Sequence, residues 1–113
     1  MRPIDKVERA LLGALIICPS LLEKCSALKP SDFSDKYRAR VYEEIVALGE
    51  FADGPMVAIR LEEKKAQPPY GHGWVSVLSA YMDDCLVDDD AVGLYAQKIK
   101  EHAIARRLEA RRT

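Results

Sequence analysis

The chain has 113 residues, of which 49% are hydrophobic and 31% are charged, and its formal net charge is −1. This length suits one domain with one core, and the composition excludes both a disordered chain and a membrane protein. The near balance of charges excludes polyanion binding that rests on net charge alone. The three cysteines, Cys18, Cys25 and Cys85, are an odd number, and we interpret them as buried thiols rather than disulfide partners.

The most continuous apolar run, residues 10–17, predicts a buried helix around which the other helices pack. The run is shorter than the roughly 20 apolar residues that cross a membrane. Asp5 and Glu8 have capping-box spacing, so we expect this helix over residues 5–18. Gly13 lies inside it, although glycine costs a helix interior about 1 kcal/mol relative to alanine. We therefore predict that Gly13 is a close-packing position where another helix, the third or the sixth, approaches.

A short second helix and a turn are expected next. Ser20 and Glu23 repeat the capping-box spacing, and the helix that they begin must end before Pro30. Residues 30–33 predict a turn in which Phe33 is a buried aromatic anchor, the second position that we expect to serve close packing.

An aspartate that can cap a helix precedes both the third and the fourth predicted helices, at Asp35 and Asp53. The third helix is predicted over residues 36–48. Its inner face consists of apolar residues at helical spacing, which are Tyr37, Val41, Ile45 and Leu48. Its charged residues are predicted to lie mostly outside, and these are Arg38, Arg40, Glu43 and Glu44. In the fourth helix, Pro55 stands in the first turn, where its missing N–H costs nothing.

Residues 66–73 predict a loop, because proline and glycine cluster there. A fifth helix is expected over residues 74–85. The aspartates at positions 88–90 then cap a long sixth helix, and their charge complements the positive end of the helix dipole. The fold class that follows is all-α, a compact orthogonal bundle of about six helices in which the last is long and extends from a globular head.

The last predicted helix suggests an interaction surface. Its apolar stripe continues past residue 103, where the chain has no obvious helix left to cover it. An amphipathic helix that outruns its own domain packs on a following helix or on another subunit. We therefore select Ile104 and Leu108 as candidate interface residues for assembly, with Tyr95 as a third.

We expect no catalytic, metal-binding or cofactor-binding residues in this chain. The two histidines and three cysteines lack the paired spacing of common zinc sites, and no Walker A motif is present. The acidic residues between positions 83 and 90 are interpreted as helix caps and a solvated connection rather than as a cation site.

Arginines gather at the end of the chain, at positions 106, 107, 111 and 112. Cations at a helix C-terminus complement the dipole, which explains most of this cluster. Contact with a polyanion or an acidic partner surface remains the alternative for Arg106, Arg107, Arg111 and Arg112.

Several segments, in order along nearly the whole chain, resemble the N-terminal domain of the DnaB-type replicative DNA helicases of bacteria and their phages. Residues 8–15 resemble the opening E-x-x-x-L-G-x-L pattern of that family, and residues 28–33 resemble its L-K-P-E-D-F turn. Residues 92–99 are similar to its N-I-x-x-Y-A-x-I-V segment, and residues 106–108 to its R-R-L ending.

This resemblance implies a non-catalytic assembly and partner-binding domain of a hexameric helicase that works in the cytoplasm during DNA replication. It implies self-association as a dimer or a trimer of dimers, formation of the ring collar, and docking of primase and in some systems a loader. DNA contact belongs to the parent helicase, and ATP and Mg are expected only in a C-terminal motor domain. It also implies one domain over residues 1–113, in which residues 1–100 are the globular head and 101–113 begin a helical hairpin that is cut short.

Two alternatives stay open at this point. One is the related helicase-binding domain of a primase, which has a similar helical fold. The other is a freestanding small DNA-binding or regulatory helical protein that uses the arginine-rich end.

Overall fold

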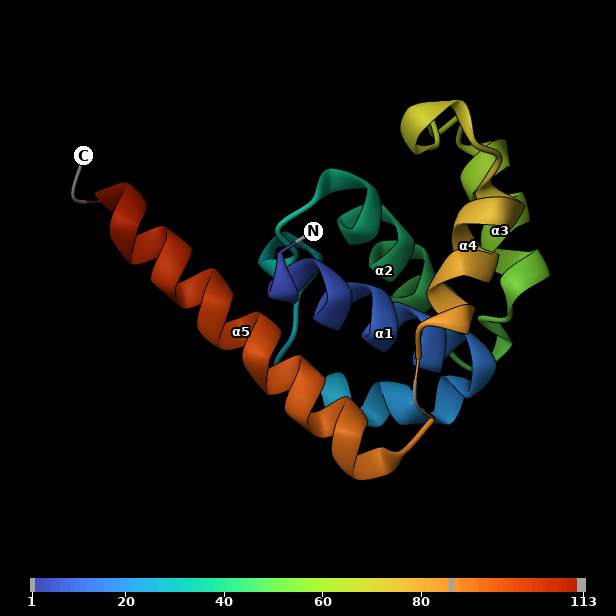
Figure 1. Ribbon diagram of the computed structural model, residues 1–113. Coiled ribbons are helices and arrows are strands. Elements are labelled where there is room, and N and C mark those ends of the chain that lie inside the picture. Colours follow the sequence, from blue (N-terminus) through green and yellow to red (C-terminus); the bar gives the residue numbers. More distant parts are fainter. Residues whose placement is uncertain (1, 86, 112–113) are drawn as a thin grey trace.

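The computed structural model describes residues 2–85 and 87–111, and this part of the chain is helical without strands (Figure 1). Its α-helices are α1 (Pro3–Ile17), α2 (Lys36–Leu48), α3 (Gly54–Glu63), α4 (Trp74–Asp83) and α5 (Asp89–Arg111). Short 3-10 helices connect them, namely η1 (Pro19–Cys25), η2 (Pro30–Asp32), η3 (Gly49–Phe51) and η4 (Pro69–Gly71). The predicted all-α bundle with a long last helix is confirmed, since α5 has 23 residues.

Helix α1 lies at the centre of the molecule and contacts α2, α4, α5 and η1 (Figure 1). Its middle turns are fully buried, because apolar side chains surround the helix there. The helix begins at Pro3, two residues earlier than predicted. Arg2 is its N-cap residue, and the Arg2 N–H donates to the Asp5 carboxylate at 3.1 Å. Asp5 therefore stands at the third helical position rather than at the cap.

The close packing at Gly13 involves α4, not the third or sixth predicted helix. A Cβ atom on Gly13 would lie 2.1 Å from the carbonyl oxygen of Tyr81 in α4. Because that neighbour is backbone, it cannot move aside as a flexible side chain would. The glycine therefore sets how closely α4 approaches the central helix.

The predicted second helix is the 3-10 helix η1. The Leu21 N–H donates to the Cys18 carbonyl at 3.0 Å, the i to i+3 pattern that short helical segments often adopt. The segment starts at Pro19, so Ser20 is inside it and does not cap it. The Tyr42 hydroxyl then donates to the Leu28 carbonyl at 3.1 Å and ties the end of this segment to α2.

Two charged residues of α2, Arg38 and Glu44, were predicted to lie outside and are buried instead. Arg38 Nε donates to Glu8 Oε1 of α1 at 2.7 Å, and Glu8 is fully buried as well. Glu44 accepts from Arg60 Nε of α3 at 3.2 Å. Helical periodicity counts a charged residue as external, but a charge can be buried where a partner neutralises it.

The helix caps and the thiols agree with the sequence in part. Asp35 and Asp53 cap α2 and α3 through backbone N–H groups, as predicted. Asp88 accepts from the Ala91 N–H at 3.0 Å at the start of α5. Cys25 is buried, whereas the other two cysteines are half-buried, so the interpretation as buried thiols holds in full only for Cys25. In the described residues, no helix is long and apolar enough to cross a bilayer.

Candidate interaction surfaces

The first candidate surface lies on α5, which runs along the core and then projects beyond it (Figure 1). The buried side chains of this helix end at Ala103. Ile104 and Leu108 follow it, one helical turn apart, with 47% and 53% of their surfaces exposed. Tyr95 is half-buried and packs against the core, so it is less available to a partner. Leu94, which the sequence analysis did not select, is also exposed on this helix.

The second feature is a polar cluster that fastens α5 to η2, and its centre is the fully buried Asp32. Arg107 Nη2 lies 2.6 Å from Asp32 Oδ1, and Lys100 Nζ lies 3.1 Å from Asp32 Oδ2. The Lys29 N–H donates to the same carboxylate at 2.8 Å. Desolvation raises the pKa of Asp32, but these hydrogen bonds and the nearby Lys100 charge outweigh it, so its pKa lies below the ordinary value.

Two of the four predicted arginines therefore have partners inside the domain. Arg107 binds Asp32, and Arg106 Nη2 lies 3.4 Å from the Asp32 carbonyl and 3.5 Å from that of Phe33. Arg111 is exposed at the end of α5, and Arg112 lies outside the described residues. The cluster is thus not a uniform polyanion surface, because half of it is directed at η2. Contact between α5 and the rest of the domain continues past residue 100.

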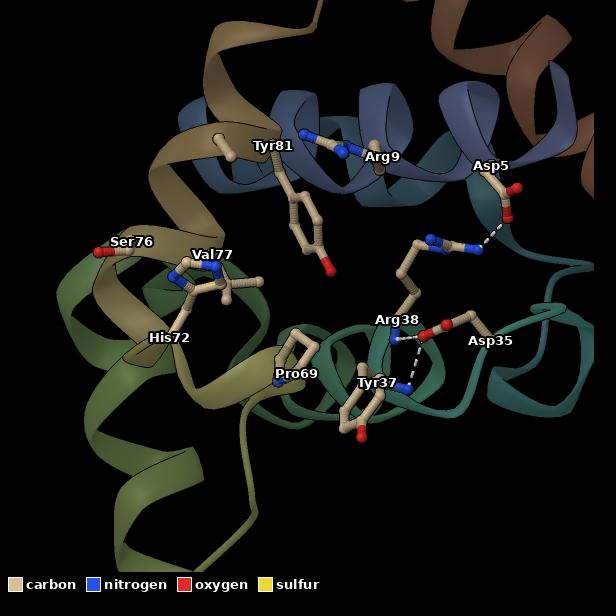
Figure 2. A pocket seen from close by; sticks show the side chains of 11 residues that line it. Asp5, Arg9, Asp35, Tyr37, Arg38, Pro69, His72, Ser76, Val77 and Tyr81 are labelled. Carbon is tan, nitrogen blue, oxygen red and sulfur yellow. Dashed lines mark hydrogen bonds and ion pairs between the residues drawn. The ribbon is translucent and has the colours of Figure 1, made fainter. Parts of the chain in front are cut away.

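The third feature is a cleft of about 680 Å³ that opens between α1, α2 and α4 (Figure 2). The loop before α4 supplies Pro69 and His72, and α4 supplies Val77, Ala80 and Tyr81. Arg9 lies over the ring of Tyr81, 5.7 Å from its centre, a cation–π arrangement. Burial raises the pKa of Tyr81 to about 12, so its hydroxyl is neutral at physiological pH.

An ion-pair network closes the cleft on the side of α1 and α2. Arg38 joins Glu8 and Asp5, and Asp5 also accepts from Arg2. Desolvation works against the charge of Arg38, but the hydrogen bond and the field of Glu8 outweigh it and raise its pKa. Desolvation likewise raises the pKa of Asp5, and the arginines lower it further than burial raises it. Asp5 and Arg38 are therefore both charged across the physiological range.

The sequence did not reveal this cleft or the Asp32 cluster. The interacting residues are 68 to 75 positions apart in the cluster, and helical periodicity carries no information on such pairs. Asp32 was inside a predicted turn, where an aspartate usually bonds only its own backbone. Among the described residues, no group of three or more His, Cys, Asp or Glu side chains is placed to hold a metal ion.

The predicted close-packing residues lie in different parts of the molecule. Gly13 contacts α4 in the centre of the domain. Phe33 is buried beside Tyr42, and the two ring centres are 4.9 Å apart. Phe33 thus lies directly after η2, so the aromatic pair and the Asp32 cluster support the same turn from two sides.

Comparison with known proteins agrees with this architecture. The family model described as "DnaB-like helicase N terminal domain" matches residues 3–101. The crystal structure of the N-terminal domain of DnaB helicase from Mycobacterium tuberculosis is similar, with a TM-score of 0.82 and 26% sequence identity. The similarity covers 93% of this chain and 76% of that one. No curated protein sequence matches the chain. Since the family model spans most of the chain, this chain belongs to the DnaB-like helicase N-terminal domain family.

Proposed function

We propose that this domain serves assembly and partner binding in a hexameric replicative helicase, without catalysis of its own. Family membership supports a role in replication, and the projecting α5 supports the assembly role. In this proposal, α5 joins neighbouring subunits as dimers within a ring collar, and the collar docks primase or a loader. The ATPase motor and the DNA contact belong to other parts of the parent helicase.

The observation that carries the assembly role is the pair Ile104 and Leu108. Both side chains are about half exposed on the part of α5 that lies beyond the last buried residue of that helix. Two apolar side chains one turn apart form the kind of anchor that dominates helix-mediated interfaces. In a two-fold symmetric dimer each subunit contributes the same pair, so four apolar side chains meet at the interface.

Light scattering on single variants tests this role. Ile104→Glu or Leu108→Glu should weaken self-association by about tenfold or more, since each places a charge in an apolar contact. Ile59→Glu on α3 is the matched control, because Ile59 is a similarly exposed residue at 50%. Circular dichroism should show the same helix content in all three variants. Equal association of the three variants would contradict the role of α5.

The alternatives from the sequence have less support. Both the family model and the similar structure belong to helicases rather than to primases. Direct DNA binding through the arginine-rich end is less well supported, because Arg106 and Arg107 contact residues in and next to η2. We therefore retain the helicase assembly role alone.

A further inference from the structure

We propose that the cleft between α1, α2 and α4 is a second binding site, which takes an uncharged, extended peptide segment of a partner protein (Figure 2). This inference does not depend on the assembly role of α5, because the residues that line the cleft come from other elements. It rests on three observations: unpaired polar atoms in the cleft, its charge balance, and its size.

Two hydrogen-bond donors at the cleft have no partner in the described chain. Tyr81 is only 5% exposed, and Figure 2 shows its hydroxyl pointing into the cleft, where no described residue bonds it. Arg9 Nε is buried without a hydrogen-bond partner, while Nη2 of the same residue is held by Asp84 at 2.9 Å. Of the two donors, only Arg9 Nε is a buried atom without a partner, whereas the Tyr81 hydroxyl faces the cleft. Buried polar groups are normally paired, so a ligand that supplies acceptors to these two donors fits this wall.

An acceptor is also available on the opposite wall. Asp35 uses Oδ1 for the backbone N–H groups of Tyr37 and Arg38, at 2.8 and 3.1 Å. Its other carboxylate oxygen accepts no hydrogen bond from the described residues. A ligand that fits both walls must therefore carry an acceptor for Tyr81 and a donor for Asp35. A peptide backbone carries one carbonyl and one N–H in every residue, and these are uncharged.

The charges around the cleft argue against a nucleic acid. The positive groups are Arg2, Arg9 and Arg38, and the negative groups, which bond them or line the cleft, are Asp5, Glu8, Asp35 and Asp84. Carboxylates thus outnumber guanidinium groups, and each of these arginines already forms an ion pair with a carboxylate. A phosphate backbone requires an excess of positive charge, which this site lacks. An uncharged peptide does not require an excess of positive charge.

The size and the apolar part of the cleft fit a short segment. A volume of about 680 Å³ falls within the usual range of ligand sites, roughly 300–1,000 Å³. Val77 and Ala80 of α4, with Pro69 of the loop, provide an apolar wall for a side chain of the peptide. On the opposite wall, ion pairs with Asp5 and Glu8 hold the Arg38 side chain in place without a ligand.

The test uses the full chain and a random peptide library displayed on phage. The chain is the bait, and the variant Ala80→Trp, in which the indole fills the cleft, serves for counter-selection. Ser79→Trp is its matched control, since Ser79 is exposed on the same helix but does not line the cleft. The selected peptides are then synthesised, and their dissociation constants are measured by fluorescence anisotropy. They should bind the wild type and Ser79→Trp but not Ala80→Trp.

A single hydroxyl provides the sharper readout. Tyr81→Phe should weaken peptide binding by about two- to tenfold, the effect of one hydrogen bond, while Tyr95→Phe on α5 should leave it unchanged. Tyr81→Phe should also unfold at the same temperature as the wild type, because the hydroxyl has no partner within the described chain.

Three results would overturn the proposal. The first is the recovery of no peptide whose binding Ala80→Trp abolishes. The second is equal binding to Tyr81→Phe and to the wild type. The third is that a single-stranded oligonucleotide, rather than a peptide, binds the wild type and loses binding in Ala80→Trp. None of these results affects self-association through α5, so failure here is separate from failure of the assembly role.

Discussion

Arg107 Nη2 lies 2.6 Å from Asp32 Oδ1, and this contact joins the projecting part of α5 to the turn before α2. Asp32 is fully buried and is also bonded by Lys100 and by the Lys29 N–H. The carboxylate therefore holds two points of α5, about two helical turns apart, against a fixed turn. Asp32 therefore adds polar contacts to the apolar packing of α5 against α1 and η1.

Asp32→Asn should destabilise the domain by about 1–3 kcal/mol, because the amide is neutral and leaves the buried ends of two cation contacts uncompensated. Urea unfolding monitored by circular dichroism measures this change. Asp90→Asn, an exposed change in the first turn of α5, should cost less than about 0.5 kcal/mol and is the control. A loss no larger than that of the control would show that α5 is held by its apolar face alone.

Stability should fall as the pH drops below the ordinary carboxyl pKa values. Burial raises the pKa values of Asp5, Asp32 and Glu44, but their cationic partners and hydrogen bonds lower them more, below 3.8 for the aspartates and 4.5 for the glutamate. Depressed pKa values stabilise the folded state above the unfolded-state values, and this contribution is lost as protons bind the folded state at lower pH.

Thermal unfolding at a series of pH values tests this expectation. The unfolding temperature should be nearly constant between pH values of about 6 and 7 and should fall steeply below about 4. Asp32→Asn should show a shallower fall than the wild type, because one of the three shifted groups is absent. Parallel curves for the two proteins would mean that Asp32 contributes nothing to the acid sensitivity.

Gly13→Ala should destabilise the domain by about 1–3 kcal/mol or more, since the new methyl group would lie 2.1 Å from the Tyr81 carbonyl oxygen. Gly13→Leu should be at least as damaging. The comparison is Gly93→Ala in α5, where no atom lies within 4 Å of the new Cβ. That change should stabilise by about 0.5–1 kcal/mol, because alanine favours a helix interior. Chemical unfolding should therefore give opposite signs for two identical substitutions.

Arg38→Met should destabilise by about 3–5 kcal/mol, because the fully buried Glu8 loses its cationic partner and keeps only the hydrogen bond from the Ser34 N–H at 2.9 Å. Adding Glu8→Leu to that variant should restore part of the loss, since two apolar side chains then replace a buried ion pair. A double-mutant cycle on unfolding free energies measures the coupling. If Arg38→Met alone changes stability by less than about 1 kcal/mol, the pair is not a buried charge interaction.

The sequence predicted the helices but not the contacts between their charged residues. Apolar periodicity located α2, α4 and α5, and Asp35 and Asp53 marked the starts of α2 and α3, because these signals act within one or two helical turns. Arg38, Glu44 and Asp32 were misplaced or overlooked, because their burial depends on partners far along the chain. The prediction of which helix packs on Gly13 was also wrong, because a glycine in a helix indicates a close approach but not which helix makes it.

Of the two proposed surfaces, the sequence indicated the one on α5 but not the cleft. The exposed pair Ile104 and Leu108 was visible as apolar residues beyond the last buried position of α5. The cleft was not, because it is formed by Arg9, Tyr81 and Asp35, which lie on three different helices or their caps. A cleft is a property of the packed domain, and no single segment carries its pattern.

Sedimentation velocity of the wild-type chain over a wide range of concentrations tests the assembly role most directly. We expect the sedimentation coefficient of the wild type to rise with concentration from that of the monomer to that of a dimer or larger species. For the Ile104→Glu variant the same rise should require a concentration at least about tenfold higher. A single monomeric species at every concentration of the wild type would contradict the claim that α5 mediates assembly.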